Sequence, residues 1–222
     1  MSATGRSNVR DPDDNYATPP WVTQLLLPYL ALQLGTRVLD PCCSEGAILR
    51  TLPTGVQGIG IELDAGRAAT ARAAGFSVTA RDALAPEPWP TADVVITNPP
   101  YRLALQFVQR ALAETGMGTV AMLLRLNWLG SQARADFHRQ HPSDVCVLSK
   151  RPSFVNGRTD ATEYSWLLWG PGRGGRWGIL GPSAPRDRGL GPGLATVQQL
   201  QGTEGNGAGI SDRCAGSGRA VR

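Results

Sequence analysis

The sequence predicts an α/β fold built on a mainly parallel β-sheet. Short apolar runs alternate with segments whose apolar residues follow a helical period, and Gly, Pro and Asp mark the boundaries between them. Polar residues also stand directly after several of the apolar runs. Strands that alternate with helices form parallel sheets that are covered on both faces, so this pattern favours an α/β domain.

The expected elements follow from this pattern in chain order. Strands are expected over 36–40, 56–62, 76–80, 92–98, 119–126, 144–149 and 163–169. Helices are expected over 18–32, 44–52, 64–75, 102–116 and 131–141. Thr18 is the expected N-cap of the first helix and Asp64 that of the third. No helix separates the last two strands, so we expect one antiparallel pairing at that edge of the sheet.

Length and composition indicate a globular chain. The 222 residues are 41% hydrophobic and 18% charged, which supports one sizeable core and excludes wholesale disorder. No run comes near the roughly 18 apolar residues of a membrane helix, and the first residues lack the apolar segment of a secretory signal. The cysteines show neither zinc-ligand spacing nor a disulfide framework. We therefore expect a reducing, cytoplasmic compartment, no membrane contact and no metal.

The excess of positive charge lies toward the C-terminal end. Residues 171–222 hold seven Arg and three Asp or Glu, whereas residues 1–170 hold fifteen charges of each sign. Fourteen of the 27 glycines also lie in residues 171–222, and no apolar period continues beyond about Gly181. We interpret residues 1–180 as one domain and residues 181–222 as a disordered Gly- and Arg-rich tail. Such a tail is either a nucleic-acid-binding segment or an extension without function.

Polar residues follow four successive apolar runs at intervals of one βα unit. They are Asp40, Glu62, Asp82 and Asn98, at separations of 22, 20 and 16 residues. A single acidic residue at such a position is ordinary helix capping. Four in succession arrive together at the carboxyl edge of a parallel sheet, where doubly wound folds bind their ligands.

The first turn, DPCCSEGA, points to a nucleoside ligand without phosphates. It contains Gly46, which allows close backbone approach, but it matches neither GxGxxG nor GxxxxGK[ST]. Glu62 would accept hydrogen bonds from both ribose hydroxyls, and Asp82 would accept one from the amino group of adenine. S-adenosylmethionine is such a ligand, and acidic neighbours would favour its sulfonium charge.

The tetrad Asn98-Pro99-Pro100-Tyr101 follows the fourth expected strand directly. The two prolines end the strand and stiffen the loop. The Asn98 side-chain oxygen and the Pro99 carbonyl can both accept hydrogen bonds from one NH₂ group, which exposes its lone pair for in-line attack on a methyl group. Tyr101 offers a ring face for a planar group. The alternative interpretation is a plain Asn-Pro-Pro surface turn.

Together with DPCCSEGAIL, GIELD and RDAL, this NPPY tetrad resembles the S-adenosylmethionine-dependent amino-methyltransferases. More narrowly, the chain resembles the small phage and prophage DNA adenine-N6 methyltransferases over about residues 14–180. The resemblance implies a Rossmann-like class I methyltransferase fold with a seven-stranded, mainly parallel sheet and one antiparallel edge strand. It implies methyl transfer from S-adenosylmethionine to adenine N6 in DNA.

The same resemblance assigns roles to further residues. The expected cofactor-binding residues are Tyr16, Thr18, Asp40, Pro41, Cys42, Gly46, Glu62, Asp82 and Asn98. The expected catalytic residues are Asn98, Pro99, Pro100 and Tyr101, and Phe154 is expected to hold the target base against Tyr101. Thr18 could instead be a helix cap, and Phe154 a core residue. One departure is Ser44, where relatives more often carry glycine, and another is that no separate target-recognition domain is visible.

Two other functions remain open at this point. The same NPPY chemistry would serve an RNA adenine or a protein glutamine amide, although the absence of an N-terminal helical domain argues against release-factor methylation. A non-catalytic nucleic-acid-binding phage accessory protein with the same fold is the alternative from another class. The expected partner is DNA that contains the target adenine, and the expected oligomeric state is a monomer or a weak dimer.

Overall fold

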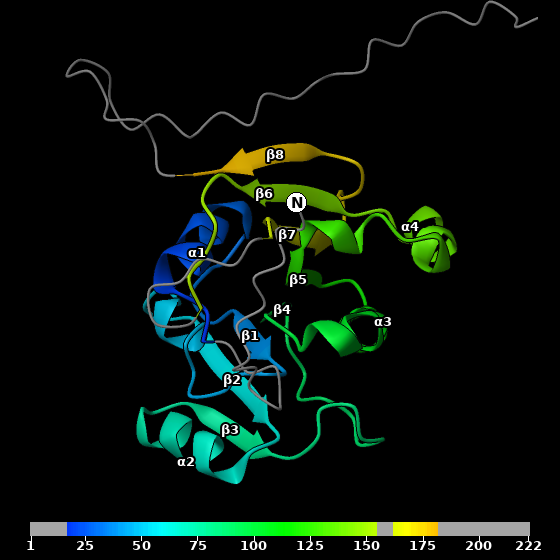
Figure 1. Ribbon diagram of the computed structural model, residues 1–222. Helices are drawn as coiled ribbons and strands as arrows, with labels where there is room; N and C mark the ends of the chain where they lie inside the picture. The colour runs from blue at the N-terminus through cyan, green and yellow to red at the C-terminus, as the bar shows by residue number, and fades with distance from the viewer. Residues whose placement is uncertain (1–16, 155–161, 182–222) are drawn as a thin grey trace, which may run out of the picture.

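The computed structural model describes residues 17–154 and 162–181, which form an eight-stranded sheet with helices on both faces (Figure 1). The strand order is β3-β2-β1-β4-β5-β7-β6-β8. The strands are β1 (Arg37–Asp40), β2 (Gln57–Glu62), β3 (Ser77–Ala80), β4 (Val94–Thr97), β5 (Thr119–Arg125), β6 (Asp144–Leu148), β7 (Tyr164–Trp169) and β8 (Trp177–Leu180). Strands β1 to β5 run parallel to one another, so the prediction of an α/β fold with a mainly parallel sheet is confirmed.

Helices and single 3₁₀ turns connect these strands. The α-helices are α1 (Pro20–Leu26), α2 (Ala65–Ala73), α3 (Ala104–Thr115) and α4 (Ala135–Gln140). The 3₁₀ turns are η1 (Leu27–Tyr29), η2 (Leu49–Thr51), η3 (Tyr101–Leu103), η4 (Leu126–Trp128) and η5 (Gln132–Arg134).

The core lies on both faces of the sheet, as the continuous apolar runs require. Along β5, Met122 and Leu124 pack into the cluster that contains Phe107 of α3, whereas Leu123 packs into the cluster that contains Val22 of α1. Successive side chains of a strand point to opposite faces, so a strand covered on both sides is apolar throughout. The helices α1 and α3 therefore lie on opposite faces of the sheet.

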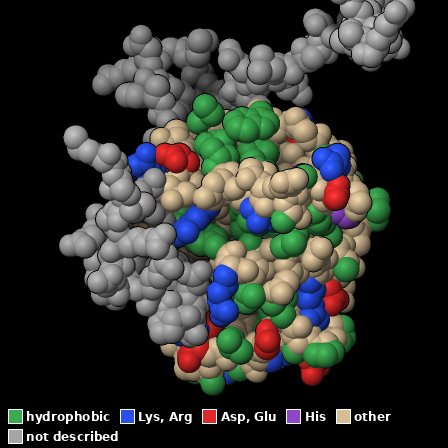
Figure 2. Space-filling model, turned by 45° about the vertical axis from the view of Figure 1, so that its right-hand side comes forward, with side chains coloured by type: hydrophobic (Ala, Val, Ile, Leu, Met, Phe, Trp, Pro, Cys, Tyr) green, Lys and Arg blue, Asp and Glu red, His purple; other side chains and the backbone are tan. Residues whose placement is uncertain are grey.

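The sheet differs from the expected one at one end. All seven expected strands are present, but β8 adds an eighth, paired in parallel with β6. The antiparallel strand is not at the edge: β7 lies between β5 and β6 and is antiparallel to both. Strand β8 was not predicted because it has only four residues, follows a Gly-rich stretch and exposes Trp177 and Ile179. Figure 2 shows hydrophobic side chains gathered at the top of the molecule, where Figure 1 places β8.

Two expected helices also differ from the prediction. The first begins after Pro19, so Thr18 is not its N-cap. The segment 44–52 forms only the 3₁₀ turn η2, because the chain first makes a tight turn at Ser44 and Gly46, both with positive φ. The helix α2 begins at the expected cap, where the Asp64 side chain accepts a hydrogen bond from the Arg67 amide.

Some expectations fall outside the described residues. Tyr16 and the predicted tail beyond residue 181 belong to this group. In the described part of the chain, no helix combines the length and apolarity needed to cross a membrane.

Candidate active site

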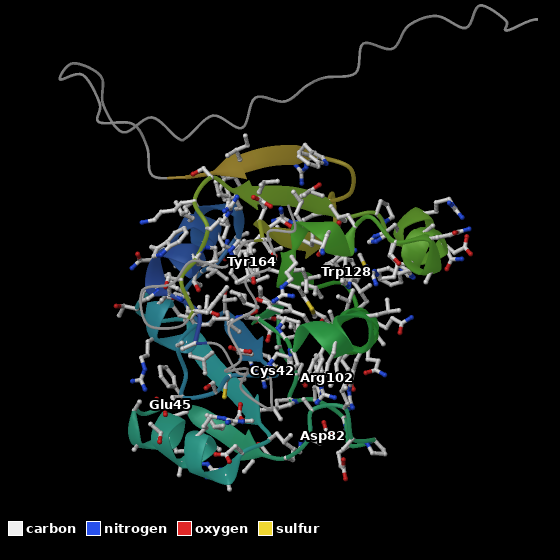
Figure 3. All side chains as sticks on the ribbon, viewed as in Figure 1. Cys42, Glu45, Asp82, Arg102, Trp128 and Tyr164 are labelled. Atoms are coloured by element: carbon white, nitrogen blue, oxygen red, sulfur yellow. The ribbon has the colours of Figure 1, made fainter. Side chains whose placement is uncertain are left out.

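A cavity opens at the carboxyl edge of the sheet, where the chain leaves β1, β2, β3 and β4. Most of the site residues predicted from the sequence line it: Thr18, Asp40, Pro41, Cys42, Glu62, Asp82, Asn98 and Pro100. Figure 3 shows the labelled Cys42, Asp82 and Arg102 grouped in this region, whereas Glu45 lies apart from them. The topology therefore brings together residues that are far apart in the chain, such as Thr18 and Asn98, which are 80 positions apart.

Asp40 is the buried anchor of this edge. Its Oδ1 accepts hydrogen bonds from the Thr97 hydroxyl at 2.7 Å and from the Cys42 amide at 3.0 Å. Burial raises the pKa of Asp40 to about 7, the nearby Glu62 adds to the rise, and the two hydrogen bonds oppose it. A cation bound in the cavity would favour the ionised form of this carboxyl group.

Glu62, at the end of β2, ties three segments together. Its Oε2 accepts from the Ser44 amide at 2.8 Å, and its Oε1 accepts from the Asp64 amide at 2.9 Å. Arg67 of α2 pairs with the same Oε1 at 2.9 Å. Each carboxylate oxygen has two acceptor positions, so Oε2 keeps room for a ligand hydroxyl while Oε1 is taken.

The turn between β1 and η2 is held in a strained conformation. Ser44 has φ +48°, a left-handed backbone conformation that costs a residue with a side chain about 1 kcal/mol or more. The hydrogen bond from its amide to Glu62 holds it there. Gly46 has φ +87°, and a Cβ atom there would lie 3.1 Å from the Phe76 ring. Gly46 does not line the cavity, so its place in this structure is explained by the turn and by the contact with Phe76.

Asn98 directly follows β4, and both ends of its amide are engaged. Its Nδ2 donates to the Thr18 hydroxyl at 3.2 Å, and its Oδ1 accepts from the Tyr101 hydroxyl at 2.9 Å. Thr18 is buried, so this contact fixes the side-chain amide with its oxygen toward Tyr101. An incoming NH₂ group that donates to Oδ1 would take the position that the Tyr101 hydroxyl holds in this structure.

Tyr101 belongs to an aromatic cluster at the edge of the sheet where β4 and β5 end and the antiparallel β7 begins. The Arg125 guanidinium lies 4.9 Å from the centre of its ring. Its ring centre is 5.8 Å from that of Tyr164. The ring centres of Phe154 and Tyr164 are 5.1 Å apart, and these two rings pack edge to face. Tyr164 is fully buried and thus supports both Tyr101 and Phe154, the two rings expected to hold a planar substrate group.

Three further predicted residues differ in their exposure to solvent. The Asp82 carboxylate is exposed and accepts from the Leu84 amide at 2.8 Å, so the side chain is oriented within its own turn. Pro99 is buried and is not among the residues that line the cavity. Burial, Asp40 and Glu62 together raise the pKa of the Cys42 thiol well above its ordinary value, so this thiol stays protonated.

Sequence reasoning missed several residues of the site. Thr97 holds Asp40, Arg67 holds Glu62, and the exposed Leu63 and Arg102 line the cavity. Thr97 and Leu63 are each adjacent in the chain to a predicted residue, so their position at a strand end was a signal that could have identified them. Nothing in the sequence pattern distinguished Arg67 from the other arginines.

Comparison with known proteins gives a partial family match. A family model described as methionine biosynthesis protein MetW matches residues 26–96, which is less than a third of the 222 residues. No curated protein matches the chain. These results do not assign the chain to a family.

Solved structures give a consistent fold. A protein of Listeria monocytogenes, described as a class I S-adenosylmethionine-dependent methyltransferase, is 17% identical with a TM-score of 0.55, and the match covers 73% of this chain and 65% of that one. The modification subunit of a type I restriction enzyme, as described from Vibrio vulnificus, is 18% identical with a TM-score of 0.55, covering 78% and 48%. The 23S rRNA methyltransferase ErmE is 17% identical with a TM-score of 0.57, covering 72% and 71%.

The first two matches thus extend over less than two thirds of the proteins concerned. At such low identities the likeness concerns the fold alone. The described chain has the Rossmann-like fold of the class I methyltransferases.

Proposed function

We propose that this protein transfers a methyl group from S-adenosylmethionine to the N6 amine of adenine in DNA. The observation that carries the proposal is the Asn98 side chain, which Thr18 fixes with its oxygen toward Tyr101 beside a cavity with two buried carboxylates. The nucleic-acid methyltransferases among the structural matches support a nucleic-acid substrate. The resemblance of the NPPY segment to DNA adenine methyltransferases favours DNA.

The residues of the cavity fit the proposed cofactor. Asp40 is buried and held partly protonated near neutral pH by desolvation, so a cationic sulfonium in the cavity would relieve an existing electrostatic cost. Glu62 would take a ribose hydroxyl through Oε2, the exposed Leu63 would cover a face of the adenine, and Asp82 would accept its amino group. When bound, S-adenosylmethionine supplies a methyl group on a positively charged sulfur.

The chain's own residues orient the amine. An adenine amine conjugates its lone pair with the ring and is a weak nucleophile. One N–H group of the amine would donate a hydrogen bond to Asn98 Oδ1 and the other would donate to the Pro99 carbonyl. This arrangement favours a tetrahedral nitrogen with an exposed lone pair. Bound S-adenosylmethionine would supply the methyl group to this lone pair, and the proton that the methylated amine must lose would leave to water. Tyr101 stacks on the base, and its hydroxyl vacates Oδ1 when the amine arrives.

The decisive test is Asn98→Ala. We expect it to lower the rate of methyl transfer at least about 100-fold, by analogy with the loss of one pre-organised hydrogen-bonding group at an active site. The affinity for S-adenosylmethionine, measured by calorimetry, should stay within about threefold. The matched control is Asn127→Ala, because Asn127 is exposed in η4 and does not line the cavity. Full activity in Asn98→Ala would show that the amine-orienting mechanism is wrong.

The substrate is tested by supplying radiolabelled cofactor with DNA, RNA and release-factor protein in parallel. Label in the N6-methyladenine of DNA supports the proposal. Label in RNA or in a glutamine amide would transfer the same chemistry to another substrate. Bound cofactor without label in any of the three would indicate the non-catalytic binding protein instead.

A further inference from the structure

Charge is divided along the carboxyl edge of the sheet. Carboxylates lie at or near the carboxyl ends of β1, β2 and β3: Asp40, Glu45, Glu62, Asp64 and Asp82. Two arginines at these ends are engaged within the protein, because Arg67 pairs with Glu62 and Arg81 donates to the Glu87 and Pro88 carbonyls. The segments after β4, β5 and β6 carry cations: Arg102, Arg125, Arg134, Lys150 and Arg151. The cavity lining contains charges of both signs, with Glu62, Asp82, Arg67 and Arg102 among its residues. The two halves of this edge are therefore suited to ligands of opposite charge.

We call these five cations the basic rim, and two of them, Arg125 and Arg151, contact Tyr164 and its neighbour Glu163 beside the Tyr101 ring. Arg125 lies over that ring and its Nε donates to the Tyr164 hydroxyl at 3.3 Å. Glu163, the neighbour of Tyr164, accepts from Arg151 at 2.6 Å. These contacts thus connect Tyr101, the neighbour of the cavity-lining Pro100, with Arg151, which follows β6.

Three cations of the basic rim lie against aromatic rings. Arg125 lies over Tyr101 at 4.9 Å, Arg134 over Trp128 at 5.1 Å and Lys150 over Trp21 at 5.8 Å. A ring under a long side chain limits its motion, so less entropy is lost when the side chain meets a partner.

We propose that the basic rim binds the phosphodiester backbone of the nucleic acid whose base enters the cavity. This inference rests on the proposed function. Phosphates repeat along a strand, and a row of cations beside the pocket would hold the strand on both sides of the extruded base. The acidic half of the edge repels the same backbone and directs it away from the cofactor end. The basic rim thus orients the nucleic acid without reading its sequence.

Glu163 allows a test in which the removal of a charged side chain should strengthen DNA binding. Its ion pair with Arg151 is about half exposed on both sides, so solvent screens it and a phosphate can replace the carboxylate. Glu163→Gln removes a negative charge from the rim and releases Arg151. We expect the affinity for DNA to rise about threefold at low salt and the gain to vanish at high salt, because exposed charges are screened.

The test measures binding of a fluorescent 30-base-pair duplex over a series of salt concentrations. The double variant Lys150→Gln/Arg151→Gln removes two cations that lie outside the cavity lining. We expect the slope of log K against log salt to become shallower by roughly 1 to 2, since each lost phosphate contact contributes about 0.9. The matched control is Arg37→Gln/Arg50→Gln, which removes two charges away from the carboxyl ends of β4 to β6 and should leave the slope unchanged.

The outcomes separate this inference from the proposed function. Equal slopes for the two double variants and the wild type, with intact folds by circular dichroism, would overturn the basic rim even if DNA is methylated. Failure of methyl transfer, with a shallower slope in Lys150→Gln/Arg151→Gln, would keep the rim and refute the enzymatic proposal. Replacing the duplex by a 30-nucleotide RNA distinguishes the source of the phosphates, and binding of neither nucleic acid would overturn the rim.

Discussion

At the residue scale, the site depends on side chains that hold other side chains. Asp40 does not project freely into the cavity, because Thr97 and the Cys42 amide both donate to its Oδ1. Asn98 is similarly held by Thr18. Strand-end positions alone predicted Asp40, Glu62 and Asn98. Their supporting partners are set by tertiary contacts between distant segments, so Arg67 and the role of Thr18 could not be derived from spacing.

The buried Asp40 carboxyl group gives a stability effect that depends on pH. Burial raises its pKa from 3.8 to about 7 in the folded chain, so between these values the folded state binds a proton that the unfolded state has lost. The wild type should therefore lose stability as pH rises from about 4 to about 7, by up to about 1.4 kcal/mol per pH unit, and then level off.

Asp40→Asn isolates this effect, because the amide oxygen can still accept from Thr97 and Cys42 but cannot ionise. Urea unfolding of both proteins at pH 5, 6, 7 and 8.5 gives the difference in their free energies of unfolding. This difference should shift in favour of Asp40→Asn up to about pH 7 and change little above it. A difference that is constant over the whole range would show that Asp40 titrates as an ordinary carboxyl group.

At the element scale, helices were predicted correctly where an apolar period or a capping residue marked them. The prediction failed where a tight turn determines the path of the chain. The apolar period of α3 and the cap of α2 marked these helices correctly. The segment after β1 reads as a helix start, but Glu62 binds the Ser44 amide and holds the chain in a turn instead. Strand β8 has no apolar period of its own, since its position is set by contacts with β6.

Asp144, at the start of β6, should hold the loop that leads into β8. Its Oδ1 accepts from the Gly174 amide at 2.9 Å, and its Oδ2 accepts from the Arg176 guanidinium at 2.6 Å. Asp144→Ala should loosen this attachment by about 2 kcal/mol, the cost of leaving buried hydrogen-bonding partners unpaired. Amide hydrogen exchange in β8 should then be about 10- to 30-fold faster, while exchange in β1 and β4 stays unchanged.

Asp136→Ala is the matched control, because Asp136 makes an exposed ion pair with Arg139 that contributes little. Burial acts to raise the pKa of Asp144, but the Arg176 guanidinium and the Gly174 and Arg176 amides outweigh it and lower the pKa. Its stabilising contribution is thus present above the ordinary pKa and is lost as pH falls through the lowered one. Unchanged exchange in β8 of Asp144→Ala would mean that strand pairing with β6 suffices.

At the scale of the whole molecule, the expected division of the chain at about residue 180 stays a prediction that truncated chains can test. The two large core clusters draw on residues from Val22 to Leu180, and the Leu180 carbonyl accepts from the Ser149 amide at 2.7 Å. The parallel direction of β1 to β5 could be predicted, because each strand is a separate apolar run followed by a helix or turn. The order of β6, β7 and β8 could not, since it depends on pairing between distant segments rather than on local sequence.

If this division is correct, a chain that ends at Gly181 should keep the stability of the full chain, because it retains every described residue of both clusters. We expect its thermal midpoint to lie within about 2 °C of the full-length value, which corresponds to less than about 1 kcal/mol for a domain of this size. A chain that ends at Gly170 is the comparison: it lacks β8 and the buried Leu180, and it removes Arg176 from the buried Asp144. Its midpoint should fall by about 5 °C or more. Equal midpoints for these two truncated chains would show that β8 is dispensable, and a large drop for the chain ending at Gly181 would show that residues beyond it belong to the domain.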